Sequence, residues 1–364
     1  MFDLDHLLIN AVGHGASDIH LKSNQRPFFR INKNLVEVES DLIPPGALME
    51  AVQRIMPEHI RKSFDERHEA DFSYNIDVVG RFRVNAFLAQ GVPAVALRHV
   101  KSNVPGFADL HLPATLEQVA GQRRGIVIIS GTTGAGKSTT LAAMVEYMNL
   151  NSRRRIVTVE DPVEYLFTDK QSIVTQREVG LDTESFEQAL KHVLRQDPDV
   201  IVIGEMRDAT SLKTAMSAAE TGHLVLTTLH AASAAVAVPR LLELMPSEEW
   251  DHARLVLSSV LQAVVCQRLC RTIKGGLVPA TELMMNTPVV RRILEQGKLE
   301  MLNEAIETGG DDGMHSFNQS LHRLITSEAI SEEEGLKHSS NPGALRMALG
   351  GISSTAQGRR ILMR

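Results

Sequence analysis

The sequence has 364 residues, of which 43% are hydrophobic and 23% are charged. This length and this balance are typical of a globular chain with two packed units, and they exclude a mostly disordered protein. The formal net charge is -6, so the chain has no overall positive field that would hold a nucleic acid. We therefore expect no nucleic-acid partner.

The cysteines and the N-terminus indicate a cytoplasmic protein. Cys266 and Cys270 are the two cysteines of the chain, and they lie in an apolar pattern that we interpret as helical, so we expect core thiols instead of a disulfide or a zinc site. The N-terminus carries Asp3 and Asp5 where a secretion signal would carry basic residues. The longest nearly apolar stretch, 255–265, is shorter than the roughly 20 residues of a spanning helix, so we expect no direct membrane insertion.

Residues 1–99 predict a small α+β domain. Apolar residues at helical spacing predict an opening helix that stops at Gly13 and Gly15. The segment "SDIHL" alternates between apolar and polar residues, which predicts a first strand. Three segments between 71 and 99 alternate in the same way and predict an antiparallel meander. The helix-forming segment "PGALMEAVQRIM" lies between them. Residues 100–113 are rich in Pro, Gly and polar residues, so we interpret them as an interdomain linker.

Residues 114–364 predict an α/β domain. Four apolar runs begin at 126, 156, 200 and 224 and alternate with helical patterns, which is typical of parallel strands covered on both faces. In one of these helices Ser185 and Gln188 predict a capping box, and the predicted buried stripe consists of Phe186, Ala189, Leu190, Val193 and Leu194. Residues 250–364 predict a mostly helical C-terminal part.

The first apolar run leads into a phosphate-binding loop. Gly131, Gly136, Lys137 and Ser138 complete the pattern of Gly, four variable residues, Gly, Lys and Ser or Thr. In such a loop the backbone N–H groups surround the phosphates at a helix N-terminus, the lysine neutralises charge and the serine hydroxyl binds Mg²⁺. A glycine-rich turn without a ligand is the alternative, but the preceding strand and the following helix favour ATP and Mg²⁺. The predicted nucleotide-binding residues are Gly131, Thr132, Thr133, Gly134, Ala135, Gly136, Lys137, Ser138 and Thr139.

Polar residues follow the other three strands, and ligands of open α/β sheets bind beyond the carboxyl ends of strands. We expect Glu205 to act as the base that orients the attacking water and to bind Mg²⁺ through water. Glu160 and Glu164 either share the metal and water shell or belong to a solvated helix cap. His230 follows the last strand and His223 precedes it, and they either sense the γ-phosphate or have structural roles.

Arginines of the N-terminal meander are candidate catalytic residues, and the family resemblance described below singles out Arg83 and Arg98 among them. In "RFRVNAFL" the alternation places Arg81 and Arg83 opposite the apolar side chains, and Arg98 lies on the next strand. An arginine row is usually a solvated surface. In a ring, however, the same side chains would reach the γ-phosphate bound to a neighbouring subunit.

Six segments, "ASDIHL", "RFRVNAF", "GTTGAGKSTT", "VTVEDPVEYLF", "RQDPDVIVIGEMRDATS" and "ETGHLVLTTLHAASA", closely resemble the type IV pilus retraction ATPases of twitching motility. The resemblance covers nearly the whole chain. It implies an α/β fold in which a PAS-like N-terminal domain precedes a RecA-like P-loop ATPase domain. It also implies a Walker A loop at 131–138, an Asp box around Glu160 and Glu164, a Walker B acid at Glu205 and a His box from His223 to His230.

The resemblance further implies a homohexamer at the cytoplasmic side of the inner-membrane base of a pilus, which uses ATP to rotate a membrane platform protein and remove pilins. Thr132 and Ala135 replace the Pro and Ser common in the family loop, at positions that vary in the general pattern. The segment "TPVVRRILEQGK" keeps only part of the "AIRNLI" helix that is tied to retraction. An accessory retraction ATPase that works beside a second, principal one is therefore one interpretation.

Three alternatives remain at this stage. Pilus assembly and type II secretion ATPases share the core, but they usually carry extra N-terminal material and a four-cysteine zinc site. A DNA motor would need a basic channel and aromatic platforms, whereas aromatic residues make up only 4% of this chain. The third alternative is a ring that binds nucleotide as a regulatory scaffold without useful turnover.

Overall fold

The computed structural model describes residues 2–31 and 34–351, and the chain divides into two compact units. The first unit is Met1–Asn103 with Glu164–Leu166, and the second is Val104–Val163 with the residues from Phe167 onward. The boundary between Asn103 and Val104 lies inside the predicted linker. Most of that segment packs in the second unit, because Phe107 and Leu112 are buried in its core.

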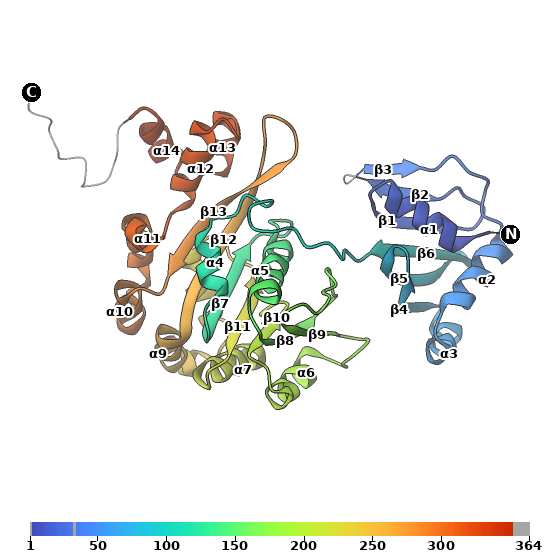
Figure 1. Cartoon of the computed structure of the whole chain (residues 1–364), viewed down its shortest axis with the longest axis horizontal. Helices are drawn as coiled ribbons and strands as arrows, with labels where there is room; N and C mark the ends of the chain where they lie inside the picture. The colour runs from blue at the N-terminus through green and yellow to red at the C-terminus, as the bar shows by residue number, and fades with distance from the viewer. Residues whose placement is uncertain (1, 32–33, 352–364) are drawn as a thin grey trace, which may run out of the picture. The chain divides into compact units, whose positions relative to one another are not determined.

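The first unit is an antiparallel sheet with helices on one face (Figure 1). The sheet has the order β3-β2-β1-β6-β5-β4. Its strands are β1 (Ala16–Lys22), β2 (Phe28–Ile31), β3 (Asn34–Glu37), β4 (Glu69–Ile76), β5 (Gly80–Ala89) and β6 (Val92–His99), and its helices are α1 (Leu4–Gly13), α2 (Pro45–Ile55) and α3 (Glu58–Arg67). The predicted opening helix, first strand, second helix and meander are confirmed. The sequence analysis did not predict β2, β3 or α3, and the two strands are only four residues long.

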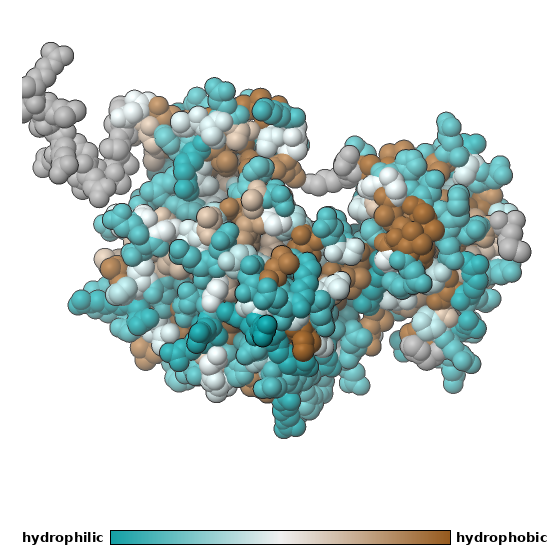
Figure 2. Space-filling model, viewed as in Figure 1, coloured by the Kyte–Doolittle hydropathy of each residue, from teal (hydrophilic) through white to brown (hydrophobic). Residues whose placement is uncertain are grey.

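Alternation along β5 separates the two faces of this sheet. Phe82, Val84 and Ala86 are buried in the core with the helices, whereas Arg83 and Asn85 are half-buried on the opposite face. The predicted alternation is therefore confirmed. In Figure 2 hydrophobic residues gather over the region of α1, whose Ile9 is exposed.

The second unit contains a mainly parallel sheet with the order β13-β12-β7-β11-β10-β8-β9. Its strands are β7 (Gly125–Gly131), β8 (Arg155–Glu160), β9 (Ile173–Glu178), β10 (Val200–Ile203), β11 (Leu224–Leu229), β12 (Leu261–Arg271) and β13 (Leu277–Met285). Only β13 is antiparallel to its neighbour. The four predicted parallel strands are β7, β8, β10 and β11, and they lie side by side.

Helices cover both faces of this sheet. They are α4 (Thr115–Ala120), α5 (Lys137–Asn151), α6 (Phe186–Val193), α7 (Ala209–Glu220), α8 (Ala234–Leu242), α9 (Trp250–Val260), α10 (Pro288–Gln296), α11 (Leu302–Thr308), α12 (Phe317–Thr326), α13 (Glu332–His338) and α14 (Pro342–Leu349). Short 3-10 helices η1 (Leu194–Gln196), η2 (Ser247–Glu249), η3 (Leu299–Met301) and η4 (Gly310–Asp312) join some of them.

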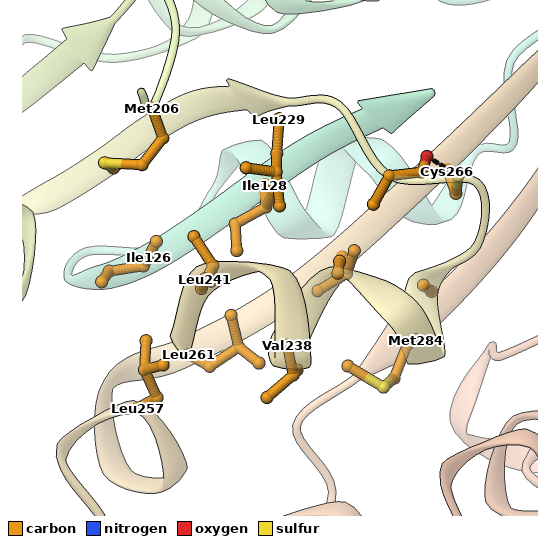
Figure 3. Close-up of a cluster of buried hydrophobic side chains, with 14 of the residues drawn as sticks. Ile126, Ile128, Met206, Leu229, Val238, Leu241, Leu257, Leu261, Cys266 and Met284 are labelled. Atoms are coloured by element: carbon orange, nitrogen blue, oxygen red, sulfur yellow. Dashed lines mark hydrogen bonds between the residues drawn. The ribbon is translucent and has the colours of Figure 1, made fainter. Parts of the chain in front are cut away.

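The central strand β7 is buried on both faces and separates two cores. Ile126 and Ile128 share one core with α6 to α9, and Val127 and Ile129 share the other with α4 and α5. Figure 3 shows the first of these, where Leu241 of α8 lies beside the isoleucines of β7. Burial of both faces explains why the strand reads as an unbroken apolar run.

Three predictions about the second unit are wrong. Cys266 and Cys270 are buried free thiols as expected, but they lie on β12 and not on a helix. The apolar pattern of this strand fits the period of a helix as well as that of a strand, and its pairing with β7 and β13 decides the conformation. In α6, Ser185 accepts a hydrogen bond from the Gln188 N–H at 3.2 Å, but within the described residues no return bond from the Gln188 side chain completes the box. Leu194 lies after α6 and is exposed, so it does not belong to the buried stripe.

Among the residues that the structure describes, no helix combines the length and the apolar character needed to cross a bilayer.

His315 generates a prediction about acid stability. It is 7% exposed, its Nε2 lies 2.9 Å from the Thr281 hydroxyl, and burial lowers its pKa from 6.5 to about 4. Because the unfolded chain takes up this proton first, the stability from neutral His315 is complete above pH 6.5 and is lost as the pH falls toward 4. We expect the free energy of unfolding to fall by about 2 kcal/mol from this residue between pH 7 and pH 5.

Replacement of His315 with Gln removes the titrating group and keeps a polar partner for Thr281. Denaturant unfolding of both proteins at the two pH values measures the difference. A wild type and a variant with the same loss of stability would contradict the prediction.

Candidate active site

The loop between β7 and α5 has a backbone that only glycine adopts readily. Gly131, Gly134 and Gly136 have φ values of 144°, 79° and 88°. A Cβ on Gly131 would lie 2.6 Å from the main-chain oxygen of Gln267 on β12. Gly136 is the N-cap of α5, and no side chain caps this helix. An amino end without a side-chain cap suits an anionic ligand.

Lys137 lies at the start of α5 and contacts both the loop and the next strand. Its Nζ donates to the main-chain oxygens of Gly131 and Thr132 at 3.0 and 3.2 Å. It also lies 3.4 Å from Nδ1 of His230, which directly follows β11. An ammonium group can only donate, so Nδ1 accepts and the proton of neutral His230 is on Nε2.

The contacts continue across the neighbouring strands. Nε2 of His230 lies 3.2 Å from Oε1 of Glu205, which follows β10. Oε2 of Glu205 accepts from Nε and Nη2 of Arg207, both at 2.8 Å. Nη1 of Arg207 lies 3.4 Å from Asp161, which follows β8. The hydrogen bond with Glu205 raises the pKa of Arg207 further above its usual range, so this residue stays charged.

Glu160 is held at the end of β8 by its strand neighbours. Its Oε1 accepts from the Thr158 hydroxyl at 2.6 Å and from Nε2 of Gln176 at 3.2 Å. Gly204, next to Glu205, packs so closely on this strand that a Cβ would lie 3.2 Å from the Glu160 Cα. The ends of β8 and β10 are therefore adjacent. Together, the structure brings Lys137, His230, Glu205 and the end of β8 to one edge of the sheet.

His223 does not join this group. It precedes β11, and its main-chain oxygen accepts from Gly125 at the start of β7. The six residues of β11 place it roughly 20 Å from the carboxyl edge at about 3.3 Å per residue. Its Nδ1 lies near the oxygen of Ala218 and the hydroxyl of Thr221, at 2.9 and 3.1 Å. Within one chain these contacts favour the structural interpretation of His223.

The other predicted residues belong to the first unit. Glu164 lies in the segment Glu164–Leu166, where its main-chain oxygen accepts from the Lys101 N–H at 3.3 Å. Arg83 of β5 pairs in register with Arg98 of β6. Nε of Arg98 donates to Asp18 at 2.7 Å, whereas the described residues offer the Arg83 side chain no hydrogen bond or ion pair.

Arg207 and Asp161 complete the site, although the sequence analysis gave them no role. The sequence signal that could have identified Arg207 was the order of residues after β10. Met206 is buried between Glu205 and Arg207, so the two charged side chains leave the strand end together. Their partner Asp161 comes from another strand, and this pairing depends on the sheet order.

The site suits a nucleotide phosphate better than a metal held by protein groups alone. Over the described residues there is no group of three or more His, Cys, Asp or Glu side chains that would bind a metal ion by itself. The loop residues Gly131 to Gly136 and the uncapped start of α5 fit phosphate. Ser138 in the first turn of α5 and the nearby carboxylate of Glu205 are the residues that fit Mg²⁺ shared with that phosphate and with water.

Comparisons with known proteins identify the family of this chain. Residues 2–308 match the family model described as Type II/IV secretion system protein. The chain is 38% identical over 348 residues to the Type IV pilus ATPase PilU of Pseudomonas aeruginosa, which covers 95% of this chain and 91% of PilU. It is also 38% identical to the Type IV pilus retractation ATPase PilT of the same organism, over 93% of this chain and 99% of PilT.

A solved structure is similar over the same extent. The crystal structure of the pilus retraction motor PilT with bound ADP superposes with a TM-score of 0.87 at 38% identity, over 94% of this chain and 98% of PilT. The second unit therefore has the RecA-like fold expected from the sequence. The chain belongs to the Type II/IV secretion system protein family.

Proposed function

We propose that this chain is an ATP-hydrolysing motor that powers pilus retraction in twitching motility. The observation that carries the proposal is the contact of Lys137 with His230 and of His230 with Glu205, next to a glycine loop that fits phosphate. These are the three roles that ATP hydrolysis needs, namely a cation for the phosphates, a neutral donor for the γ-phosphate and a carboxylate that orients water. The name of PilT, a type IV pilus retractation ATPase, supports the direction of the motor.

Each residue has a defined role in the proposed reaction. The loop amides and Lys137 bind the phosphates, and Lys137 leaves the main-chain oxygens of Gly131 and Thr132 to do so. Oε1 of Glu205 orients the attacking water, while Arg207 keeps Oε2 in place. Mg²⁺, held by the Ser138 hydroxyl and through water by Glu205, would neutralise charge on the β- and γ-phosphates. Glu160 supports the water shell from the adjacent strand.

The proposed assembly is a homohexamer that docks on an inner-membrane pilus platform protein at the cytoplasmic face. Arg83 and Arg98 lie on the sheet face opposite the helices of the first unit. On that face they are the proposed trans-acting arginines for the nucleotide of a neighbouring subunit. Glu164, which is exposed in the first unit, has a proposed place in the same shared site.

The helix α10 bears on whether this motor is principal or accessory. Its buried face is Val290, Ile293 and Leu294, while Val289 is 61% exposed beside the exposed Arg291. This surface differs from the "AIRNLI" pattern in the residues that it presents. We propose an accessory retraction ATPase that works beside a second one.

The first prediction from the proposed function concerns Glu205. Replacement with Gln removes the negative charge that orients water, so we expect phosphate release to fall about 100-fold or more. ATP binding, measured with a fluorescent ATP analogue, is retained because Lys137 and the loop are intact. Glu220→Gln at the exposed end of α7 is the matched control and keeps wild-type turnover.

Retained turnover in Glu205→Gln would remove this residue from the reaction. A wild type that binds ATP without releasing phosphate would favour the regulatory scaffold instead.

The second prediction concerns the trans arginines. Lys137→Ala subunits lack ATP binding but still carry Arg83, and Arg83→Ala subunits have the reverse defect. Mixed rings therefore regain some ATPase activity where a Lys137→Ala subunit donates Arg83 to its neighbour. A Lys137→Ala and Arg83→Ala double variant serves as the control partner and gives no recovery. Equal activity with both partners at every mixing ratio would count against the trans arrangement.

The third prediction concerns the direction of the motor. Deletion of the gene in its host is expected to leave surface fibres present and to impair their retraction. Fibre counts by electron microscopy and surface motility measure the effect. Absent fibres would point to pilus assembly.

A further inference from the structure

The segment after His230 is tied to the rest of the second unit through Ala231, Ala232 and Ala234. We call His230–Ser233, between β11 and α8, the sensor loop. The Ala231 N–H donates to the Ser130 hydroxyl at 3.1 Å, and its oxygen accepts from Ser130 at the same distance and from Sγ of Cys266 at 3.4 Å. Figure 3 shows this Cys266 contact as a dashed line. At the start of this segment the His230 side chain contacts Lys137.

Glu282 of β13 joins the end of the sensor loop to a distant helix. Its side chain is buried, Oε1 accepts from the N–H of Ala234 at 2.7 Å, and Oε2 accepts from the N–H of Phe317 at 3.4 Å. Ala234 begins α8 and Phe317 begins α12. Burial raises the pKa of Glu282, while these two N–H groups act against that rise. One carboxylate therefore connects the amino ends of two helices.

Arg268 of β12 makes a second connection between the same parts. Its Nη2 donates to the oxygen of Ala232 in the sensor loop at 3.0 Å, and its Nη1 donates to the oxygen of His338 at the end of α13. Its guanidinium lies 3.9 Å from the centre of the Phe317 ring, an arrangement that favours the cation. Arg268 thus contacts the sensor loop, α12 and α13 together.

The contact at the start of the loop depends on the nucleotide. The ammonium of Lys137 now contacts Gly131, Thr132 and His230. The phosphates of a bound nucleotide compete for the same three donor positions. When the ammonium moves toward the phosphates, its contact with His230 changes as well, and the residues after His230 are held by Ser130, Arg268 and Glu282. A shift of His230 therefore acts on residues that have fixed partners.

We propose that Arg268 and Glu282 are positioning residues that tie the sensor loop to the first turn of α12, so that nucleotide binding at Lys137 changes the packing of α12 and α13. The inference rests on the proposed roles of Lys137 and His230. It extends them to a helix whose far side, with Asn318 and His322, lines a cavity of about 710 Å³. This gives the ATP site a physical connection to the C-terminal helices.

Hydrogen exchange of the α12 amides tests the connection in the full-length assembled protein. In wild type, a non-hydrolysable ATP analogue is expected to change exchange in Phe317–Thr326 by about threefold or more. In Arg268→Gln most of this change is lost, while the affinity for the analogue stays within about twofold. Arg271→Gln is the matched control, because Arg271 is an exposed arginine on the same strand.

Glu282→Gln gives a second variant with a defined defect. An amide oxygen accepts from only one of the two helix N–H groups, since the other end of the side chain donates. We expect the same loss of nucleotide response in α12. Arg268 is only half-buried, so Arg268→Gln decides the question if Glu282→Gln reduces the folded yield.

Three results would overturn the inference. If the analogue binds to wild type without changing hydrogen exchange in α12, the proposed connection does not exist, and the proposed function is unaffected. If Arg268→Gln shows the full response, Arg268 has no part in the connection, and the proposed function is again unaffected. A wild type that fails to bind the analogue would instead overturn the proposed function and this inference with it, and the binding measurement separates the cases.

Discussion

The parallel register of β7, β11, β10 and β8 is the constraint on which the site depends. Parallel strands end at the same edge, so the residues after each strand meet without any long loop. Ile128 aligns with Thr227, and Thr227 aligns with Ile203. This register places Lys137, His230 and Glu205 in successive contact. A slip of one residue would turn every strand side chain toward the opposite core.

The register is stable because both faces of each central strand are buried. The side chains of β7, β10 and β11 are buried at every position. No polar face is available to compensate for a shifted pairing. The hydrophobic cores therefore fix the geometry of polar residues that they do not touch, and the carboxyl edge is left as the place where polar groups gather.

Much of this arrangement could be predicted from sequence because its signals are local. The phosphate loop is one contiguous pattern, and the unbroken apolar runs identify strands covered on both faces. His223 and His230 could also be separated, since one precedes β11 and the other follows it. Their shared motif obscured the fact that a strand carries them to opposite edges of the sheet.

The features that escaped prediction depend on partners far away in the sequence. Cys266 and Cys270 lie in a segment that fits a helix as well as a strand, and only its pairing with β7 and β13 makes it β12. Arg207 has no distinguishing pattern in the sequence, and only the sheet order brings Asp161 beside it. Glu282 likewise becomes a link between helices only when α8 and α12 begin at the same place. Such contacts are set by topology, which short patterns do not encode.

The central claim is that Lys137 and Glu205 together support hydrolysis of a bound triphosphate. Release of phosphate from ATP by the purified, assembled wild-type protein, with and without added magnesium, is the most direct measurement. The account predicts steady release that requires magnesium. A protein that neither binds ATP nor releases phosphate when magnesium is present would contradict it.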